Sequence, residues 1–364
     1  MELLNKNETE KKADLLSMLP AELEEFIISI GEPKYRAKQL FSQMHKGSSP
    51  SEMTNIGKAT LAKLDAHSFF ALPKVRRKLV SAIDGTVKYL FELSDGNCVE
   101  SVVMKYKHGN TICISSQVGC RMGCAFCAST IGGKVRDLLP SELLGQVIAA
   151  AKDTGERISN IVMMGIGEPL DNYANVIKFL RLVNCEDGVG IGYRHISLST
   201  CGVVDKIDLL AKEEFPITLS ISLHASDDNT RSEIMPINRK WNIHALLTAC
   251  RNYYSVTGRR ISFEYTLIAG KNDSPAAALR LAELLNTELR KEKKGGESFP
   301  IHVNLIPVNP VDETGFSSSG KEAVAKFASI LEKKGIRATV RRRLGADINA
   351  SCGQLRRAEG LSEE

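Results

Sequence analysis

The sequence predicts an α/β protein built around a partial (β/α)6 barrel, with an N-terminal helical accessory domain and a β-hairpin extension. Three observations support this prediction. Apolar residues recur at helical spacing in residues 14–70, alternate with other residues between positions 86 and 105, and strand-like and helix-like segments then take turns to about residue 342. With about six such units, a partial barrel fits better than a complete eightfold one.

The N-terminal part is expected to be helical. Leu23, Phe26, Ile27 and Ile30 lie at the spacing of one helical face, and the GEP at 31–33 ends that helix. Two more helices are predicted from apolar residues at similar spacing, namely Leu40, Phe41 and Met44, and then Ile56, Leu61 and Leu64. We therefore assign residues 1–80 to a helical accessory domain.

The period then changes from helix to strand. In TVKYLFEL (86–93) every second residue is apolar or aromatic, as on a half-buried strand, and SDGN supplies turn residues. CVESVVMK (98–105) follows as the second strand of a hairpin. Residues 81–108 are assigned to this extension.

The remaining core, residues 109–343, alternates strands and helices. Seven strands are expected: TICIS, ISNIVMM, HISLST, ITLSISL, RISFEYTL, IHVNLIP and RATVRR. Helical patterns lie between them, one of them with Ser274 as N-cap and Pro275 at the first helical position. Such repeats predict a parallel sheet with its ligand site at the carboxyl ends of the strands. KEKKGGES (291–298) is expected to be a loop, and residues 344–364 a C-terminal loop.

The composition limits the class of protein. The 364 residues are 43% hydrophobic and 25% charged, with a formal net charge of +5. No apolar run is long enough to cross a bilayer, and the charged start, MELLNKNETEKKADLL, lacks the secretory pattern. We expect a cytoplasmic protein with no membrane partner, in which the nine cysteines are candidates for metal binding or catalysis rather than structural disulfides.

Two segments are dense in lysine and arginine: PKVRRK (73–78) and KKGIRATVRRRLG (333–345). Such clusters suit a polyanion such as RNA. A solvated charged face is the plainer alternative, and charge alone does not decide between them.

Three closely spaced cysteines follow the first core strand. Cys120, Cys124 and Cys127 have the spacing C-x3-C-x2-C, which suits three corners of a [4Fe–4S] cluster and leaves one iron open to a small molecule. The spacing resembles that of the radical S-adenosylmethionine (SAM) enzymes. The resemblance implies that the open iron chelates SAM, which is split into methionine and a 5′-deoxyadenosyl radical. The alternative is a structural zinc site with Cys98 or His108 as fourth ligand.

Small and polar residues follow later strands at the ends where a SAM pocket is expected. In MMGIGEPL, glycines 165 and 167 would let the backbone approach a ligand, and Glu168 could accept a hydrogen bond from the SAM ammonium. Each such residue alone could be ordinary loop polarity, but together they suggest a ring around one site. The full candidate set for SAM is Gly167, Glu168, Ser199, Ser222, Leu223, His224 and Asn309.

The longer motifs CISSQVGCRMGCAFCAST, MGIGEPL, SISLHA, MPIN and DINASCGQL resemble the RlmN family over residues 32–355. Members of that family methylate C2 of an adenosine in the peptidyl transferase centre of 23S rRNA, and many also modify the adenosine 3′ of the tRNA anticodon. The resemblance implies two SAM molecules per turnover, 23S rRNA and tRNA as partners, and an electron donor such as flavodoxin or ferredoxin. It also implies that the helical domain binds RNA.

Two further cysteines take roles from this resemblance. Cys352 is implied to take a methyl group from one SAM, and the radical from a second SAM removes a hydrogen from that S-methyl group. The resulting methylene radical adds to C2 of the adenine. Cys113 then attacks the sulfur of Cys352, forms a disulfide and frees the methylated base. The alternative for either residue is a buried packing cysteine.

Glu100 matches the family position of the base that takes the C2 proton. On its strand it shares a face with Cys98, Val102 and Met104, so we expect apolar neighbours and a raised pKa. The alternative is an exposed glutamate on an edge strand.

Two other functions compete. One is the C8-methylating antibiotic-resistance branch, against which Pro169 after Gly-Glu argues; the other is a zinc-stabilised RNA-binding protein without catalysis. Cys201, Asn349 and Ser351 depart from common family residues. Nothing in the sequence indicates an oligomer, so a monomer is expected.

Overall fold

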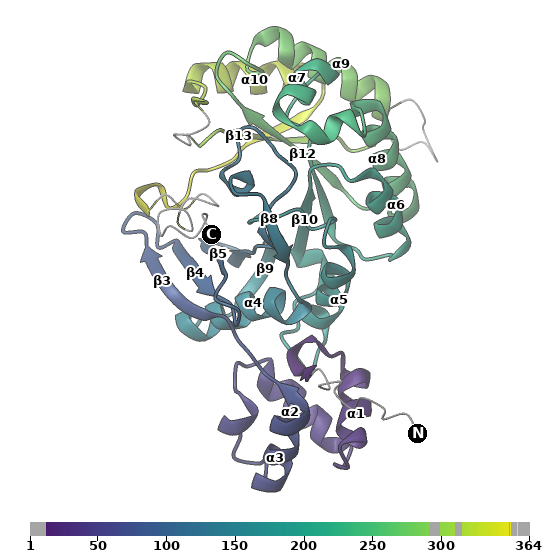
Figure 1. Cartoon of the computed structure of the whole chain (residues 1–364). Helices are drawn as coiled ribbons and strands as arrows, with labels where there is room; N and C mark the ends of the chain where they lie inside the picture. The colour runs from purple at the N-terminus through teal and green to yellow at the C-terminus, as the bar shows by residue number, and fades with distance from the viewer. Residues whose placement is uncertain (1–11, 291–298, 310–314, 349, 351–354, 356–364) are drawn as a thin grey trace, which may run out of the picture.

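Figure 1 shows the computed structural model, which describes residues 12–290, 299–309, 315–348, 350 and 355. The expectations for Cys352 and for the loop 291–298 lie outside these residues. So do parts of the predicted N- and C-terminal segments.

The N-terminal lobe is helical, as predicted. It contains α1 (Pro20–Ser29), α2 (Tyr35–Met44) and α3 (Lys58–His67), and lies beside α4 and α5 at one end of the molecule (Figure 1). Leu23 and Ile27 of α1 are buried, and Gly31 ends that helix with a φ of 73°. The lobe begins and ends in a short parallel pair, β1 (Ala13–Asp14) with β2 (Ser68–Phe69).

The main body contains a ten-stranded sheet with the order β14-β13-β12-β11-β10-β9-β6-β5-β4-β3. Its antiparallel part comprises β3 (Lys74–Val80), β4 (Val87–Glu92) and β5 (Cys98–Tyr106), and β5 pairs with β6 (Gly109–Cys113). The expected hairpin is therefore β4–β5, and it continues the barrel sheet. β3 was not expected as a strand, because four of its seven residues are cationic; it lies on the N-terminal side of the boundary placed at residue 80.

The parallel part confirms all seven predicted core strands. They are β6, β9 (Ile158–Met163), β10 (Ile196–Thr200), β11 (Thr218–Ser222), β12 (Ile261–Leu267), β13 (His302–Pro307) and β14 (Arg337–Val340). The outer layer comprises α4 (Pro140–Thr154), α5 (Tyr173–Asn184), α6 (Val204–Lys212), α7 (Asp228–Ile234), α8 (Ile243–Thr257), α9 (Pro275–Leu289) and α10 (Lys321–Lys333). Every crossover between successive parallel strands carries at least one of these helices. The predicted cap is confirmed, because Ser274 accepts a hydrogen bond from Ala277 N–H.

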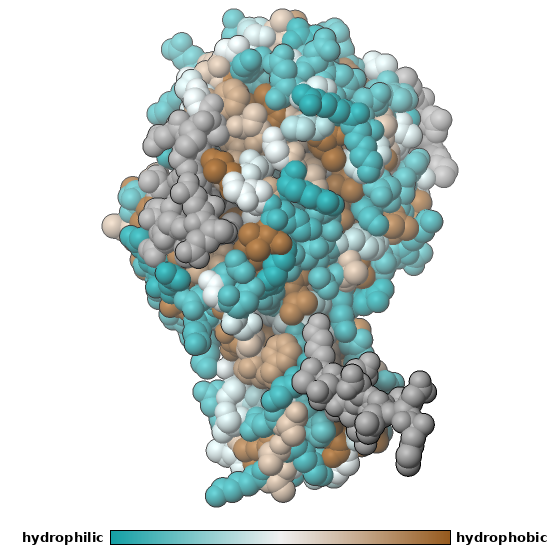
Figure 2. Space-filling view, in the orientation of Figure 1, coloured by the Kyte–Doolittle hydropathy of each residue, from teal (hydrophilic) through white to brown (hydrophobic). Residues whose placement is uncertain are grey.

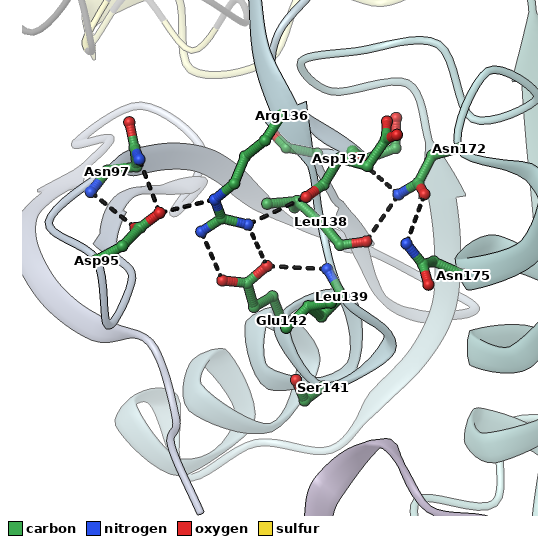
Figure 3. A network of polar contacts seen from close by, with 12 residues as sticks. Asp95, Asn97, Arg136, Asp137, Leu138, Leu139, Ser141, Glu142, Asn172 and Asn175 are labelled. Carbon is green, nitrogen blue, oxygen red and sulfur yellow. Dashed lines mark hydrogen bonds and ion pairs between the residues drawn. The ribbon is translucent and has the colours of Figure 1, made fainter. Parts of the chain in front are cut away.

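A second, small sheet frames the cysteine loop. β7 (Gln117–Gly119) and β8 (Lys134–Asp137) pair antiparallel on either side of it. Figure 3 shows how β8 is fixed: Arg136 binds both carboxylate oxygens of Glu142 on α4 at 2.7 and 2.8 Å, and Nε binds Asp95 in the β4–β5 turn at 2.7 Å. Asn172 also donates to the carbonyl of Leu138, just after β8, at 2.8 Å. These contacts tie the loop to the barrel and to the hairpin.

Hydrophobic residues from both faces of the parallel sheet form one extensive core under the outer helices. On the face shown in Figure 2, hydrophilic residues cover most of the outer helices. In the described part of the chain, no helix is long and apolar enough to cross a membrane.

Candidate active site

The three cysteines of the motif line one cavity of about 210 Å³, here called the cysteine cavity. It lies at the carboxyl ends of the parallel strands, as the fold predicts. Most of the candidate SAM residues lie in its wall with Cys120, Cys124 and Cys127, namely Gly167, Glu168, Ser199, Ser222 and His224. Residues far apart in the sequence are thus gathered at one site.

Backbone contacts hold the cysteine loop in place. Gly119 has a φ of 76°, and a Cβ there would lie 1.9 Å from the carbonyl oxygen of Gly133, so only glycine fits. The next residue, Cys120, donates its N–H to the same carbonyl at 3.0 Å. Farther along the loop, Ala125 N–H donates to the carbonyl of Ile234 at the end of α7, 2.9 Å away.

The thiols of this loop suit a metal cluster. Burial raises the pKa of Cys120 to about 12, and burial followed by repulsion from Cys127 and Cys120 raises the pKa of Cys124 well above its usual range. Three closely spaced thiolates need a compensating positive charge, which bound iron supplies.

The alternative zinc site is not supported by the positions of its ligands. Among the described residues, no three His, Cys, Asp or Glu side chains are placed to hold one metal ion. A zinc site needs such convergence, whereas a [4Fe–4S] cluster takes each thiolate on a separate iron. Cys98 instead packs with Leu90 and Leu355, and His108 stacks on Tyr106.

Glu168 is buried in the cavity wall. Its two carboxylate oxygens accept hydrogen bonds from the N–H groups of Cys201 and Leu170, at 2.7 and 3.0 Å. Burial raises the pKa of this carboxyl despite those bonds. The preceding Gly167 has a φ of 104° and lines the cysteine cavity. A Cβ there would lie 2.6 Å from Gln117 Cβ and 2.7 Å from Gln117 N, so only glycine fits.

His224 is held as a neutral imidazole. Its Nδ1 accepts a hydrogen bond from Thr266 N–H at 2.8 Å, so the ring proton is on Nε2. Burial lowers the pKa of His224 to about 3, and the ring packs edge-on against Phe126 beside Cys127. Leu223 is fully buried and does not line the cavity; its carbonyl accepts a hydrogen bond from Arg231 Nε at 3.1 Å.

A second cavity, of about 280 Å³, adjoins the first and is here called the outer cavity. The two share Phe126, Cys127, Met164, Thr266, Ile306 and Arg341 in their walls. Cys113 lies in the wall of the outer cavity with Val102 and Met104. Asn309, a candidate for SAM, also lies here and not in the cysteine cavity.

Glu100 is buried in the middle of the sheet, between β4 and β6, so the exposed edge-strand alternative is wrong. It lies on the strand face that carries Val102 and Met104, as expected. The expected apolar neighbours are joined by one charged group, because Lys88 Nζ on β4 lies 3.1 Å from Glu100 Oε2.

Comparison with known proteins identifies this arrangement. The Radical SAM superfamily matches residues 114–282, and the "Ribosomal RNA large subunit methyltransferase N-terminal domain" matches residues 13–69. A Clostridium tetani protein described as "Probable dual-specificity RNA methyltransferase RlmN" is 52% identical, over 94% of this chain and 96% of its own length. A similarly named protein of Alkaliphilus oremlandii is 50% identical, over 95% and 98%.

The chain belongs to the RlmN family. A crystal structure of a radical SAM methyltransferase from Sphaerobacter thermophilus has the same fold, with a TM-score of 0.87 and 41% identity over 94% of this chain and 99% of that one. The protein is a radical SAM methyltransferase that uses a [4Fe–4S] cluster and SAM.

The C-terminal segment of this RlmN-family chain approaches the outer cavity. Ala350 packs against the cluster of Val102, Met104 and Cys113. Leu355 is buried against Leu90 and Cys98. Cys352 itself lies outside the described residues, but its described neighbours on both sides contact the β4–β5 face that carries Glu100.

Three polar residues of the site were missed by sequence reasoning. Glu264 on β12 is buried in the cysteine cavity and accepts hydrogen bonds from Ser262 and Asn304, at 2.9 and 2.6 Å. An acid inside a core strand of otherwise uncharged residues was the available signal. Arg341 lines both cavities, whereas the sequence placed it only in a basic segment suited to RNA. Lys88 pairs with Glu100, although its sequence context resembles an ordinary charged surface.

Arg231 on α7 was also missed, and it braces two strand ends beside the cysteines. It is fully buried and donates to the carbonyls of Cys201 and Ser222, at 2.7 and 3.2 Å, and to Leu223 as above. Nη1 also donates to the side chain of Asn238 at 3.0 Å. These four acceptors are neutral oxygens, so the buried guanidinium brings positive charge close to the site that holds anionic thiolates.

Proposed function

We propose that this RlmN-family enzyme methylates C2 of an adenosine in 23S rRNA, in the peptidyl transferase centre, and of the adenosine 3′ of the anticodon in tRNA. One observation supports this most strongly. Cys113 and Glu100 belong to the same small region as Ala350 and Leu355, which flank Cys352 in the sequence. If Cys113 and Cys352 were only packing residues, there would be no reason for Cys113 and the neighbours of Cys352 to lie near Glu100 and beside the cysteine cavity.

The cofactor residues are assigned from the cavity walls. Cys120, Cys124 and Cys127 would hold the cluster. Gly167, Glu168, Ser199, Ser222 and His224 would hold SAM, with Asn309 reaching it from the outer cavity and the backbone at Leu223 completing the set. When bound, these groups supply the methyl group and the radical chemistry.

The protein's own residues would then act in sequence. Cys352 carries the methyl-derived carbon on its sulfur, and this carbon then forms a bond to C2 of the adenine. Glu100 accepts the C2 proton, and the unpaired electron of the adduct would return to the loaded cluster. The Cys113 thiolate attacks the Cys352 sulfur, and the carbon–sulfur bond breaks with its electron pair on the methyl-derived carbon, which takes up a proton as the methylated base leaves. The Cys113–Cys352 disulfide left behind needs a thiol reductant before the next turnover.

RNA would be bound by the N-terminal lobe and by cations around the outer cavity. Arg341, Arg342 and Arg343 line that cavity, and no Asp or Glu does so among the described residues. β3 presents an exposed run of cations from Lys74 to Lys78 at the sheet edge. We further propose a cytoplasmic monomer reduced by a flavodoxin or ferredoxin.

The C8-methylating reaction is the competing activity, and nucleoside analysis separates the two. Purified 23S rRNA and tRNA lacking the modification are incubated anaerobically with enzyme, SAM and reductant, digested and examined by mass spectrometry against standards. We expect 2-methyladenosine from both RNAs. If 8-methyladenosine is the sole product, the C2 assignment is refuted. If 2-methyladenosine forms in rRNA but not in tRNA, tRNA is not a substrate.

A further inference from the structure

A third cavity extends the barrel interior away from the cysteines. It has a volume of about 360 Å³ and is here called the lower cavity. Its wall includes Tyr106, His108, Asn160, Arg194, His195 and Arg341. No Asp or Glu lines it within the described part of the chain, so its ionisable side chains there are two arginines, two histidines and a tyrosine.

One wall is a flat aromatic pair. Tyr106 ends β5 and His108 lies in the turn before β6; their rings are 5.2 Å apart and nearly parallel, at 15°. The tyrosine is 37% exposed. Such a surface offers a nucleic-acid base a stacking partner that does not depend on base identity.

The turn that carries this pair is fixed in place. Lys105 and Asn110, on either side of it, both bind the carboxylate of Glu156, at 2.5 and 2.8 Å. Gly109 has a φ of 116°, and a Cβ there would lie 2.7 Å from Ser159 Oγ on β9. The turn therefore lies directly against the neighbouring strand, and little ordering would be needed on binding.

The wall of the lower cavity also carries cationic groups. Arg194 is exposed and makes no ion pair or side-chain hydrogen bond within the described residues. Arg341 has no carboxylate partner there either; its Nη1 contacts Met164 Sδ at 3.8 Å. His195 Nδ1 lies 3.0 Å from Asn160 Oδ1, which orients its ring at the cavity wall. An unpaired guanidinium group such as that of Arg194 suits a phosphate.

The lower cavity is continuous with the proposed site of the target base. Met104, Tyr106, Met164 and Arg341 line both it and the outer cavity. Building on the proposed function, we propose that the lower cavity binds the nucleotide next to the target adenosine. Its base stacks on the Tyr106–His108 pair, and its phosphate lies against Arg194.

The test measures RNA affinity in the anaerobic, cluster-loaded enzyme. The probe is a fluorescent RNA hairpin whose loop carries an adenosine, and its dissociation constant is followed by anisotropy over a range of salt concentrations. His108→Ala and Arg194→Ala should each weaken binding by about tenfold. Arg194→Ala should also lower the slope of log affinity against log salt by about one.

Arg280→Ala is the matched control. It removes the same charge as Arg194→Ala, but from the outer helix α9, where the Arg280 side chain is 52% exposed. Its affinity should stay within about twofold of wild type. A hairpin with 4-thiouridine beside the adenosine should photo-crosslink to the peptide that contains Tyr106 and His108. Wild-type affinity in both cavity variants, or equal losses in Arg194→Ala and Arg280→Ala, would overturn the proposal.

Two further outcomes separate this inference from neighbouring explanations. If adenosine monophosphate occupies the cavity but neither variant changes RNA affinity, the site binds a free nucleotide and the inference is wrong. If the variants lose affinity as expected while the wild-type enzyme makes no 2-methyladenosine, the cavity assignment stands and the proposed function fails.

Discussion

Lys88 Nζ lies 3.1 Å from Glu100 Oε2, and the two side chains are only 1% and 0% exposed. They come from the adjacent strands β4 and β5, on the sheet face that Leu355 of the C-terminal segment covers. A buried carboxylate and a buried ammonium each cost free energy unless they are paired, so each residue keeps the other in place. The proposed base thus depends on a lysine that the sequence did not reveal as functional.

Lys88→Met should therefore destabilise the protein strongly. Removing one partner of a buried ion pair costs about 3–5 kcal/mol in the free energy of unfolding, because the other charge is left uncompensated. Lys105→Ala, which breaks the exposed pair with Glu156, is the control and should change the free energy of unfolding far less, because water screens that pair. Urea unfolding of the two variants compares them; equal effects would argue that the buried pair is unimportant for stability.

The cysteine assignment predicts a selective loss of iron. Replacing Cys120, Cys124 or Cys127 by Ala should abolish iron binding and reductive cleavage of SAM, because the cluster loses a thiolate corner. Cys185→Ser is the control, since Cys185 lies at the end of α5, outside both cavities. Iron content and 5′-deoxyadenosine release are measured; a triple-alanine variant that still methylates RNA would refute the radical mechanism.

The basic segment after β14 should bind RNA. Arg341 lines the cysteine cavity, so only Arg342 and Arg343, which line the outer cavity, are suitable for charge reversal. Arg342→Glu combined with Arg343→Glu should weaken RNA binding by at least about tenfold at low salt and leave SAM cleavage unchanged. Unchanged RNA affinity would favour a merely solvated charged face.

Buried histidines should make the protein less stable in mild acid. Burial lowers the pKa of His45 to about 4, so the folded protein keeps this ring neutral while the unfolded chain protonates it below about pH 6.5. The contribution of the neutral His45 ring to the free energy of unfolding is complete above pH 6.5. It is lost as the pH falls toward 4, at about 1.4 kcal/mol per pH unit.

His45→Gln should reduce this pH dependence. Between pH 7 and pH 5.5, the variant should lose about 1 kcal/mol less unfolding free energy than the wild type, because its side chain does not titrate. In the wild type, Val189 N–H donates a hydrogen bond to His45 Nδ1 at 3.3 Å, and a glutamine side chain still offers an acceptor for it. Denaturant midpoints at the two pH values provide the measurement, and identical pH dependence in both proteins would contradict the assignment.

Local sequence predicted the framework well. The helical spacing of Leu23 and Ile27, the strand at TVKYLFEL and the Ser274 cap all correspond to the observed elements, because each depends on neighbours close in the chain. The expectation of a half-buried strand at TVKYLFEL is wrong, because β4 is buried on both faces inside the sheet. The position of the cysteines after the predicted strand TICIS also indicated the carboxyl end of the sheet correctly, since only the short β7 lies between β6 and Cys120.

The remaining features depend on contacts between distant segments. β3 has too many cations to look like a strand, and it is ordered by pairing with β4. Lys88 and Glu264 have charged side chains whose burial follows from cross-strand and barrel packing. Gly165 and Gly167 leave no room for a side chain, because a Cβ would lie 2.5 Å from the carbonyl oxygen of Ile114 and 2.6 Å from Gln117 Cβ, in the segment after β6.

The central claim is that Cys352 becomes joined to the RNA and Cys113 releases it. Substituting each by alanine separates the two roles on a denaturing gel, after anaerobic reaction with substrate RNA, SAM and reductant. Cys352→Ala should give free protein only, since it has no sulfur to carry the carbon. Cys113→Ala should give an RNase-sensitive shifted band, because no thiolate remains to attack the Cys352 sulfur. A fully active Cys113→Ala enzyme with no trapped species, or no covalent band in either variant, would contradict the account.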